Sequence, residues 1–224
     1  NLAYFHDGHL MKKLGAASVF ITMNWGLYIM AVNTGHIFEA SLAYFINPII
    51  CLLFSALFFK EPLNGCQKAS AVVAAAGILL AFCLYGDVPW LSLMCFPFAV
   101  YSVIKKTVNV PGMVSVFIES LYMVMPSAVY ILWMNGKGAG ASTVLSGWEW
   151  LLLPMTGILT AIPMALFSAG LRGISFSVAS ILMYLSPGIQ IFLALFYGEM
   201  LSPIMLINFA FVLVAVVLYS VGTI

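Results

Sequence analysis

The stretch Glu39-Ala-Ser-Leu-Ala-Tyr-Phe-Ile-Asn-Pro48-Ile-Ile-Cys-Leu-Leu-Phe-Ser-Ala-Leu-Phe-Phe-Lys60 carries charge only at its two ends. The 20 residues between Glu39 and Lys60 are uncharged. An α-helix of that length rises about 30 Å, which is the thickness of the hydrocarbon layer of a bilayer. We therefore expect the stretch to cross a membrane as one helix, kinked at Pro48, where a backbone hydrogen bond is lost.

The composition of the whole chain agrees with that expectation. Of its 224 residues, 64% are hydrophobic and 7% are charged, and the mean hydropathy is +1.12. A water-soluble domain could not cover so much apolar side chain with so few charges. The net charge of +1 creates no strong electrostatic field, which argues against nucleic acid as a partner. The predicted fold class is an all-α integral membrane protein.

Eight apolar runs, uncharged except for Glu119 in the fifth, are long enough, or nearly so, to be transmembrane helices. Short connections that contain Pro, Gly and Asn separate them, and the longest connection, residues 135–147, is rich in glycine and predicts a flexible loop. The expected spans lie between Lys13 and His36, between Glu39 and Lys60, between Lys68 and Asp87, from near Pro89 to before Lys105, from Met113 to Met134, from Trp150 to Leu171, from Ser175 to Gly198, and from Ser202 to the C-terminus.

The basic residues predict the orientation of these spans. Lysine and arginine are retained on the cytoplasmic side of a membrane. If the loops alternate between the two sides, seven of the eight basic residues lie on one side, and Lys137 alone lies on the other. We therefore expect a multi-pass protein of the cell (inner) membrane with both ends in the cytoplasm.

The stretch that begins at Glu39 recurs later in the chain. Serine and proline are seven residues apart in both copies. The recurring residues are Ala40-Ser41, Tyr44, Pro48 and Glu61 in the first copy and Ala179-Ser180, Tyr184, Pro187 and Glu199 in the second. With a repeat unit of five helices, an odd number, the two copies enter the membrane from opposite sides, which is an inverted repeat.

The repeat also predicts the domain organisation. Residues 1–86 would hold the last three helices of the first repeat, and residues 87–224 would hold the complete second repeat of five. The chain starts at Asn1 rather than at methionine. We expect two further helices to precede Asn1 in the native protein, which would give a five-plus-five bundle.

Several of these residues together resemble a known family. They are Asn24-Trp25, Ala31-Val-Asn33, Gly35-His36, the run Glu39-Ala-Ser-Leu-Ala-Tyr44-Phe-Ile-Asn47-Pro48, Glu61, Tyr184, Pro187 and Gly198-Glu199. The pattern resembles the RarD proteins, which belong to the EamA group of drug/metabolite transporters and are often described as chloramphenicol-sensitivity permeases. The resemblance implies a ten-helix inner-membrane permease with two EamA repeats, and it leaves the substrate open.

Glu119 is the one clear ionisable side chain inside an expected span. A charge in hydrocarbon is costly, so such residues point inward and often mark a transport pathway. We expect Glu119 to contact substrate or to couple transport to protons. The alternative is that Glu119 reaches the cytoplasmic interface or pairs with Lys105 or Lys106.

Other polar and aromatic residues offer hydrogen bonds or a flat face to an organic solute. Asn24, Trp25, Tyr44 and Asn47 are the expected substrate contacts, with Asn33, Gln190 and Asn208 as weaker ones, although such residues also bridge helices. Pro48 and Pro187 are the expected hinges, because paired kinks in inverted halves suit alternating access. Their alternative role is a static kink that shapes packing. Glu61 and Glu199 are expected to be helix-end caps or loop ion pairs.

Other chemistries find little support in the sequence. His6, Asp7 and His9 flank a turn near the N-terminal end and do not predict a metal site, and the four cysteines have no paired spacing. We expect no cofactor. One helix face carries small side chains, which predicts close helix packing; they belong to Ser70, Ala71, Ala74, Ala75 and Gly77.

The sequence therefore predicts a secondary transporter of a small organic solute, in which two inverted halves alternate around a cavity at the membrane midplane. No nucleotide-binding loop is found in the sequence, so transport would use an ion gradient, a substrate gradient or a partner protein. An intramembrane enzyme is the alternative, although it needs a cluster of acids, histidines or a nucleophile at membrane depth. A channel is disfavoured because no helix carries a polar stripe. A homodimer is compatible with the sequence.

Overall fold

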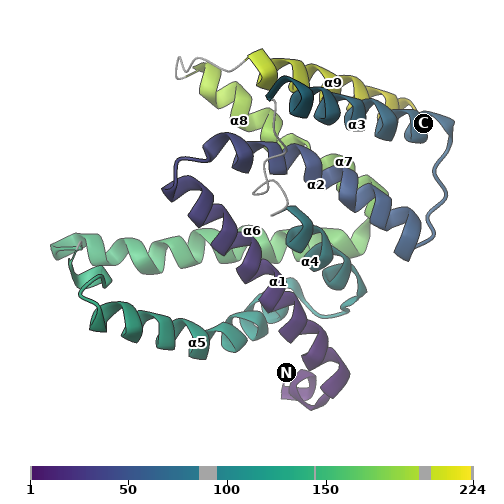
Figure 1. Cartoon of the computed structure of the whole chain (residues 1–224). Coiled ribbons are helices and arrows are strands. Elements are labelled where there is room, and N and C mark those ends of the chain that lie inside the picture. Colours follow the sequence, from purple (N-terminus) through teal and green to yellow (C-terminus); the bar gives the residue numbers. More distant parts are fainter. Residues whose placement is uncertain (1, 86–94, 144, 197–202, 223–224) are drawn as a thin grey trace. The chain divides into compact units, whose positions relative to one another are not determined.

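The computed structural model of the chain describes residues 2–85, 95–143, 145–196 and 203–222 (Figure 1). The regular elements in these residues are helices, and short 3-10 helices precede α1 and α6. The α-helices are α1 (Gly8–Asn33), α2 (Ile37–Phe58), α3 (Gly65–Tyr85), α4 (Cys95–Thr107), α5 (Gly112–Gly136), α6 (Leu152–Gly173), α7 (Phe176–Leu182), α8 (Leu185–Phe196) and α9 (Pro203–Val221).

These helices are consistent with a membrane protein. Helices α1, α3, α5 and α6 are long and apolar enough to span a bilayer, whereas the apolar segments found in α2, α9 and the α7–α8 region are shorter. The expected boundaries agree with most helices within a few residues, although α1 begins at Gly8 rather than after Lys13. The expected fourth span starts in residues that lie outside the described part of the chain. Eight spans and an inverted repeat therefore remain predictions.

The chain divides into two compact units. Unit 1 consists of Asn1–Val19 and Ile104–Gly173, and unit 2 consists of Phe20–Val103 and Ile174–Ile224.

Unit 1 is built on α5 and α6, which pack closely where α5 begins. Gly112 lies so near the backbone of Ala165 that a side chain at position 112 would collide with the Ala165 carbonyl oxygen. The first part of α1 is attached to α5 by the Tyr122 hydroxyl, which donates to the Met11 carbonyl at 3.0 Å. Lys106 at the end of α4 donates to the Leu171 carbonyl of α6 at 2.8 Å. The ends of α4 and α6 that carry basic residues therefore lie together.

In unit 2, α3 packs along α9, and Figure 1 shows the two helices side by side. The Ser70 hydroxyl donates to the Ala215 carbonyl at 2.6 Å, and Gly77 faces Asn208 and Phe211. Because higher residue numbers in α3 meet lower ones in α9, the helices are antiparallel. The expected small-residue face of α3 makes this contact, with Ser70 and Gly77 buried. These two helices correspond to each other in the predicted repeat, and an inverted repeat requires them to be antiparallel.

The helix expected from Ser175 to Gly198 is interrupted near Pro187, and its expected end lies outside the described residues. α7 ends at Leu182 and α8 begins at Leu185, two residues before Pro187. Proline has no N–H to donate to the Met183 carbonyl, and its ring crowds that carbonyl. The Ser186 N–H bonds to the Met183 carbonyl instead, at 3.2 Å, in a tighter turn. By contrast, α2 continues through Pro48 without a break.

The contact between α3 and α9 predicts a large effect of a single methyl group. In Gly77→Ala the new Cβ would lie 2.6 Å from Cβ of Phe211, which cannot move without shifting α9. We expect a loss of about 1–3 kcal/mol and a lower Tm of the purified protein in detergent.

Gly157→Ala in α6 is the matched control, because nothing lies within 4 Å of its added Cβ. It should leave the Tm unchanged or raise it slightly, since alanine favours the helix. Equal Tm values for Gly77→Ala and the parent protein would contradict the described packing of α3 on α9.

Candidate functional site

Glu119 lies in a buried ion pair in unit 1. Its Oε1 atom is 2.6 Å from Nζ of Lys105 and accepts a hydrogen bond from the Ser115 hydroxyl at 2.9 Å. Lys105 also donates to the Ser115 hydroxyl. Lys105 is 0% exposed and Glu119 is 6% exposed. The three side chains thus form a compact network that joins the end of α4 to the first half of α5.

This network changes the interpretation of both charged residues. The sequence placed Lys105 in a cytoplasmic loop, but the lysine belongs to the last turn of α4 and is fully buried. The pairing with Lys105 was the alternative role considered for Glu119. Removing one partner of a buried ion pair leaves a charge without compensation and costs about 3–5 kcal/mol. Glu119 therefore has a structural role, whether or not it also takes part in transport.

Asn47 in α2 is buried in unit 2 and makes weak hydrogen bonds. Its amide nitrogen donates to the sulfur of Met183 at 3.6 Å, and its oxygen accepts from the thiol of Cys51 at 3.8 Å. Sulfur is a weak hydrogen-bonding atom, both as donor and as acceptor. A solute carrying an amide, carbonyl or hydroxyl group could replace these bonds at little cost. Asn47 also lies beside Met183, at the break between α7 and α8.

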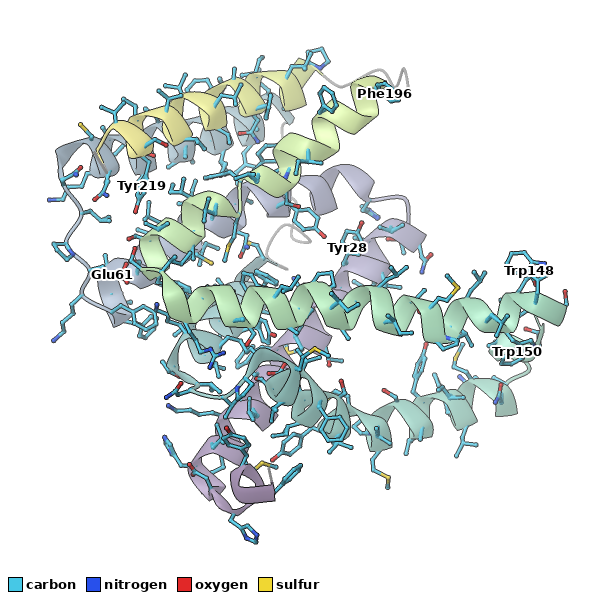
Figure 2. All side chains as sticks on the ribbon, turned by 180° about the vertical axis from the view of Figure 1, so that it is seen from behind. Tyr28, Glu61, Trp148, Trp150, Phe196 and Tyr219 are labelled. Atoms are coloured by element: carbon cyan, nitrogen blue, oxygen red, sulfur yellow. The ribbon has the colours of Figure 1, made fainter. Side chains whose placement is uncertain are left out.

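Aromatic side chains of α1 and α2 meet in the same unit. The rings of Tyr28 and Tyr44 pack edge to face, with centroids 6.0 Å apart, and Figure 2 shows Tyr28 on its helix. Trp25 lies three residues before Tyr28, so it shares the same face of α1. Trp25 and Tyr44 are 42% and 37% exposed, respectively. Asn24 is half-buried on α1. These exposed rings could stack against a flat organic solute.

Two further buried polar groups belong to Tyr184, at the break between α7 and α8, and to Asn208, on α9. Among the residues that the structure describes, the hydroxyl of Tyr184 and the amide of Asn208 have no hydrogen-bond partner. Tyr184 is 4% exposed and packs in the same apolar cluster as Phe45 and Leu52 of α2. A buried polar group without a partner costs free energy, and a bound solute or water would remove that cost. From the sequence, Tyr184 is assigned only to the repeat and to the family resemblance, because a tyrosine in an apolar run gives no sign that its hydroxyl lacks a partner.

The predicted site residues are divided between the two units. Glu119 belongs to unit 1. The residues in unit 2 are Asn24, Trp25, Tyr44, Asn47, Pro48 and Pro187. Within unit 2, the contacts bring Tyr44 to the aromatic face of α1 and Asn47 to the α7–α8 break. The side chain of Gln190 and all of Glu199 lie outside the described residues.

Known proteins match this chain over most of its length. Residues 4–83 match the EamA-like transporter family. The uncharacterized transporter YojE of Bacillus subtilis (strain 168) is 37% identical over 212 residues, which cover 93% of this chain and 70% of that protein. Protein RarD of Streptomyces exfoliatus is 36% identical, with coverage of 93% and 68%, and protein RarD of Escherichia coli (strain K12) is 31% identical, with coverage of 94% and 72%. No solved structure matches the chain.

A pair of variants separates the structural role of Glu119 from a role in transport. Glu119→Leu leaves the buried Lys105 ammonium without its carboxylate, and we expect a loss of about 3–5 kcal/mol, seen as a lower Tm and a lower yield. The double variant Lys105→Met, Glu119→Leu replaces both charges with apolar groups and should recover most of this loss.

Solute uptake by the double variant then tests the transport role. Uptake at the parental rate and pH dependence would exclude Glu119 from proton coupling. Failure of the double variant to regain stability would contradict the described ion pair.

Proposed function

We propose that this protein, which belongs to the EamA-like transporter family and is a RarD-type membrane transporter, moves a small organic solute across the cell membrane by alternating access. In this proposal both chain ends are cytoplasmic, and transport is driven by a solute or ion gradient. The relatives support the class of function. The substrate and the mechanism are our inference.

The broken helix in unit 2 is the observation that carries the proposal. Helices that are interrupted at membrane depth are common at the binding sites of transporters, because interrupted turns free backbone groups to bind solutes. Here the break at Met183 and Tyr184 lies against Asn47 of α2. Asn47 has only weak sulfur bonds, and the hydroxyl of Tyr184 has no partner among the described residues, so this place has an unused capacity for hydrogen bonding.

The polar and aromatic side chains of unit 2 favour a particular class of solute. Asn47 and Tyr184 offer an amide and a phenol, and Trp25 and Tyr44 offer aromatic faces. None of these groups carries a charge at neutral pH. We therefore infer that the substrate has a flat apolar part and a hydrogen-bonding group, as aromatic drugs and aromatic metabolites have. Glu119 remains a candidate for proton coupling in this proposal.

Counterflow in proteoliposomes tests the proposed function. Vesicles that contain the full-length protein are loaded with one unlabelled solute from a panel of aromatic drugs, including chloramphenicol, and amino acids. Accumulation of the same labelled solute from outside is then measured. We expect accumulation for at least one solute and none in protein-free vesicles. Absence of counterflow across the panel, with correctly inserted protein, would contradict the proposal.

Asn47→Leu should weaken binding of the transported solute with little effect on stability, because only two weak sulfur bonds are lost. We expect an increase in KM of about tenfold, which corresponds to one neutral hydrogen bond. Met183→Leu is the matched control, since it removes the sulfur acceptor and keeps the volume. Equal KM values for Asn47→Leu and Met183→Leu would exclude Asn47 as a substrate contact.

The two prolines should differ in their effect on transport. Pro187→Ala supplies an N–H for the Met183 carbonyl and favours a continuous helix. We expect the counterflow rate to fall about tenfold without a loss of Tm, because a hinge residue affects the conformational change rather than the stability of the fold. Pro48→Ala is the matched control and should have a smaller effect, because α2 is already continuous at Pro48. Equal rates for the two variants would exclude the break as a moving part.

A further inference from the structure

Glu61 lies just beyond the end of α2, in the connection to α3. The residue before it, Lys60, has a positive φ of 51°, which is rare for a residue with a side chain and common where a helix ends. This left-handed conformation turns the chain sharply after Phe59. The Glu61 carboxylate is thereby directed back towards α2 and across to α7, and Figure 2 marks its position.

The Glu61 carboxylate joins α2 to the first turn of α7. Its Oε2 atom accepts a hydrogen bond from the Ser55 hydroxyl at 2.6 Å and one from the Ser177 N–H at 2.9 Å. Its Oε1 atom accepts from the Phe176 N–H at 2.8 Å. The rings of Phe59 and Phe176 pack beside this contact, with centroids 5.1 Å apart. The charge of Glu61, just beyond α2, thus satisfies two N–H groups at the start of α7 that have no partner within that helix.

Glu61 remains ionised at neutral pH. Desolvation raises the pKa of this carboxyl, but the hydrogen bonds from Ser55, Ser177 and Phe176 lower it by more, so the pKa is below its usual value. The stabilisation that comes from this ionisation is present above the usual pKa of a glutamate. It is lost as the pH falls through the lowered pKa.

α7, the helix that Glu61 contacts, is short, and it does not continue directly into α8. α7 has seven residues and stops at the break before α8. Glu61 belongs to the first copy of the predicted repeat and α7 to the second. A motion of one copy against the other on the side of the α2–α3 connection must therefore break the two hydrogen bonds from Phe176 and Ser177 to Glu61. That side carries Lys60 and Lys68, so it is the predicted cytoplasmic side.

We propose that Glu61 is a gate residue: its carboxylate holds α7 against α2 when the transport path is closed on the cytoplasmic side, and it releases α7 when that side opens. This inference rests on the proposed transport function. It assigns to Glu61 a mobile contact with another helix, whereas the sequence alone indicated a helix-end cap or a loop ion pair.

Labelling of a buried position on α7 tests the gate without the need for a substrate. Ser180 is 0% exposed and lies one turn into α7. Ser180→Cys is introduced into the full-length protein after replacement of its native cysteines by alanine. A membrane-impermeant maleimide is then applied to inside-out and to right-side-out membrane vesicles. With Glu61 present, labelling should be slow.

In Glu61→Ala we expect Ser180→Cys to react at least about tenfold faster in inside-out vesicles, because loss of the hydrogen bonds to the carboxylate shifts the equilibrium towards the open form. Glu61→Asp, which keeps a shorter carboxylate, should give an intermediate rate. Lys60→Gly is the matched control, because glycine accepts the positive φ and leaves the carboxylate in place. Its labelling rate should equal that of the parent.

Ser102→Cys provides the control for general loosening, since Ser102 is also buried in unit 2. Equal rates at Ser180→Cys with and without Glu61, or equal acceleration at Ser102→Cys, would overturn the gate. Acceleration only in right-side-out vesicles would overturn its cytoplasmic assignment. If Glu61→Ala does not fold, the labelling rate of Ser180→Cys in Glu61→Asp is compared with the rate in Lys60→Gly, and equal rates would overturn the gate. Counterflow that fails while the labelling behaves as expected would refute the transport function and leave the mobile contact in place.

Discussion

A backbone N–H or C=O group in the hydrocarbon layer has no water to bond to, and this constraint explains much of the structure described above. It favours helices for the apolar segments, since each helix satisfies its own backbone groups. It also applies where a helix ends, because the backbone groups there need other hydrogen-bond partners. At Met183 and Tyr184 the helix gives way to a turn: Pro187 has no N–H for the Met183 carbonyl, and the Ser186 N–H bonds to that carbonyl instead.

The same constraint acts on polar side chains. Glu119 and Lys105 are tolerated at 6% and 0% exposure because they neutralise each other and share Ser115. Asn47 instead has sulfur atoms as its partners, and Tyr184 has none among the described residues. Side chains with strong partners hold helices together. Asn47 and Tyr184, which have weak partners or none among the described residues, lie at the helix break.

Helix pairs in unit 2 differ in how closely they pack. α3 and α9 are antiparallel and in close contact along small residues, so a sliding motion between them would meet steric resistance at Gly77. α7 is short and is held at its start by the Glu61 carboxylate. We infer that the α3–α9 pair is the fixed part of unit 2 and that the α2–α7 contact is the part that changes.

The amino-acid sequence by itself determined the membrane class, most helix boundaries and the small-residue face of α3, because these depend on local hydrophobicity and spacing. The family resemblance followed from the same local run around Pro48. Tertiary structure decided which polar groups meet: Glu119 with Lys105, Asn47 with Met183, and Glu61 with the start of α7. These pairs are 14, 136 and 115 residues apart in sequence. Hydrophobic pattern fixes which residues enter the membrane, whereas the partner of a buried polar group depends on which helices lie side by side.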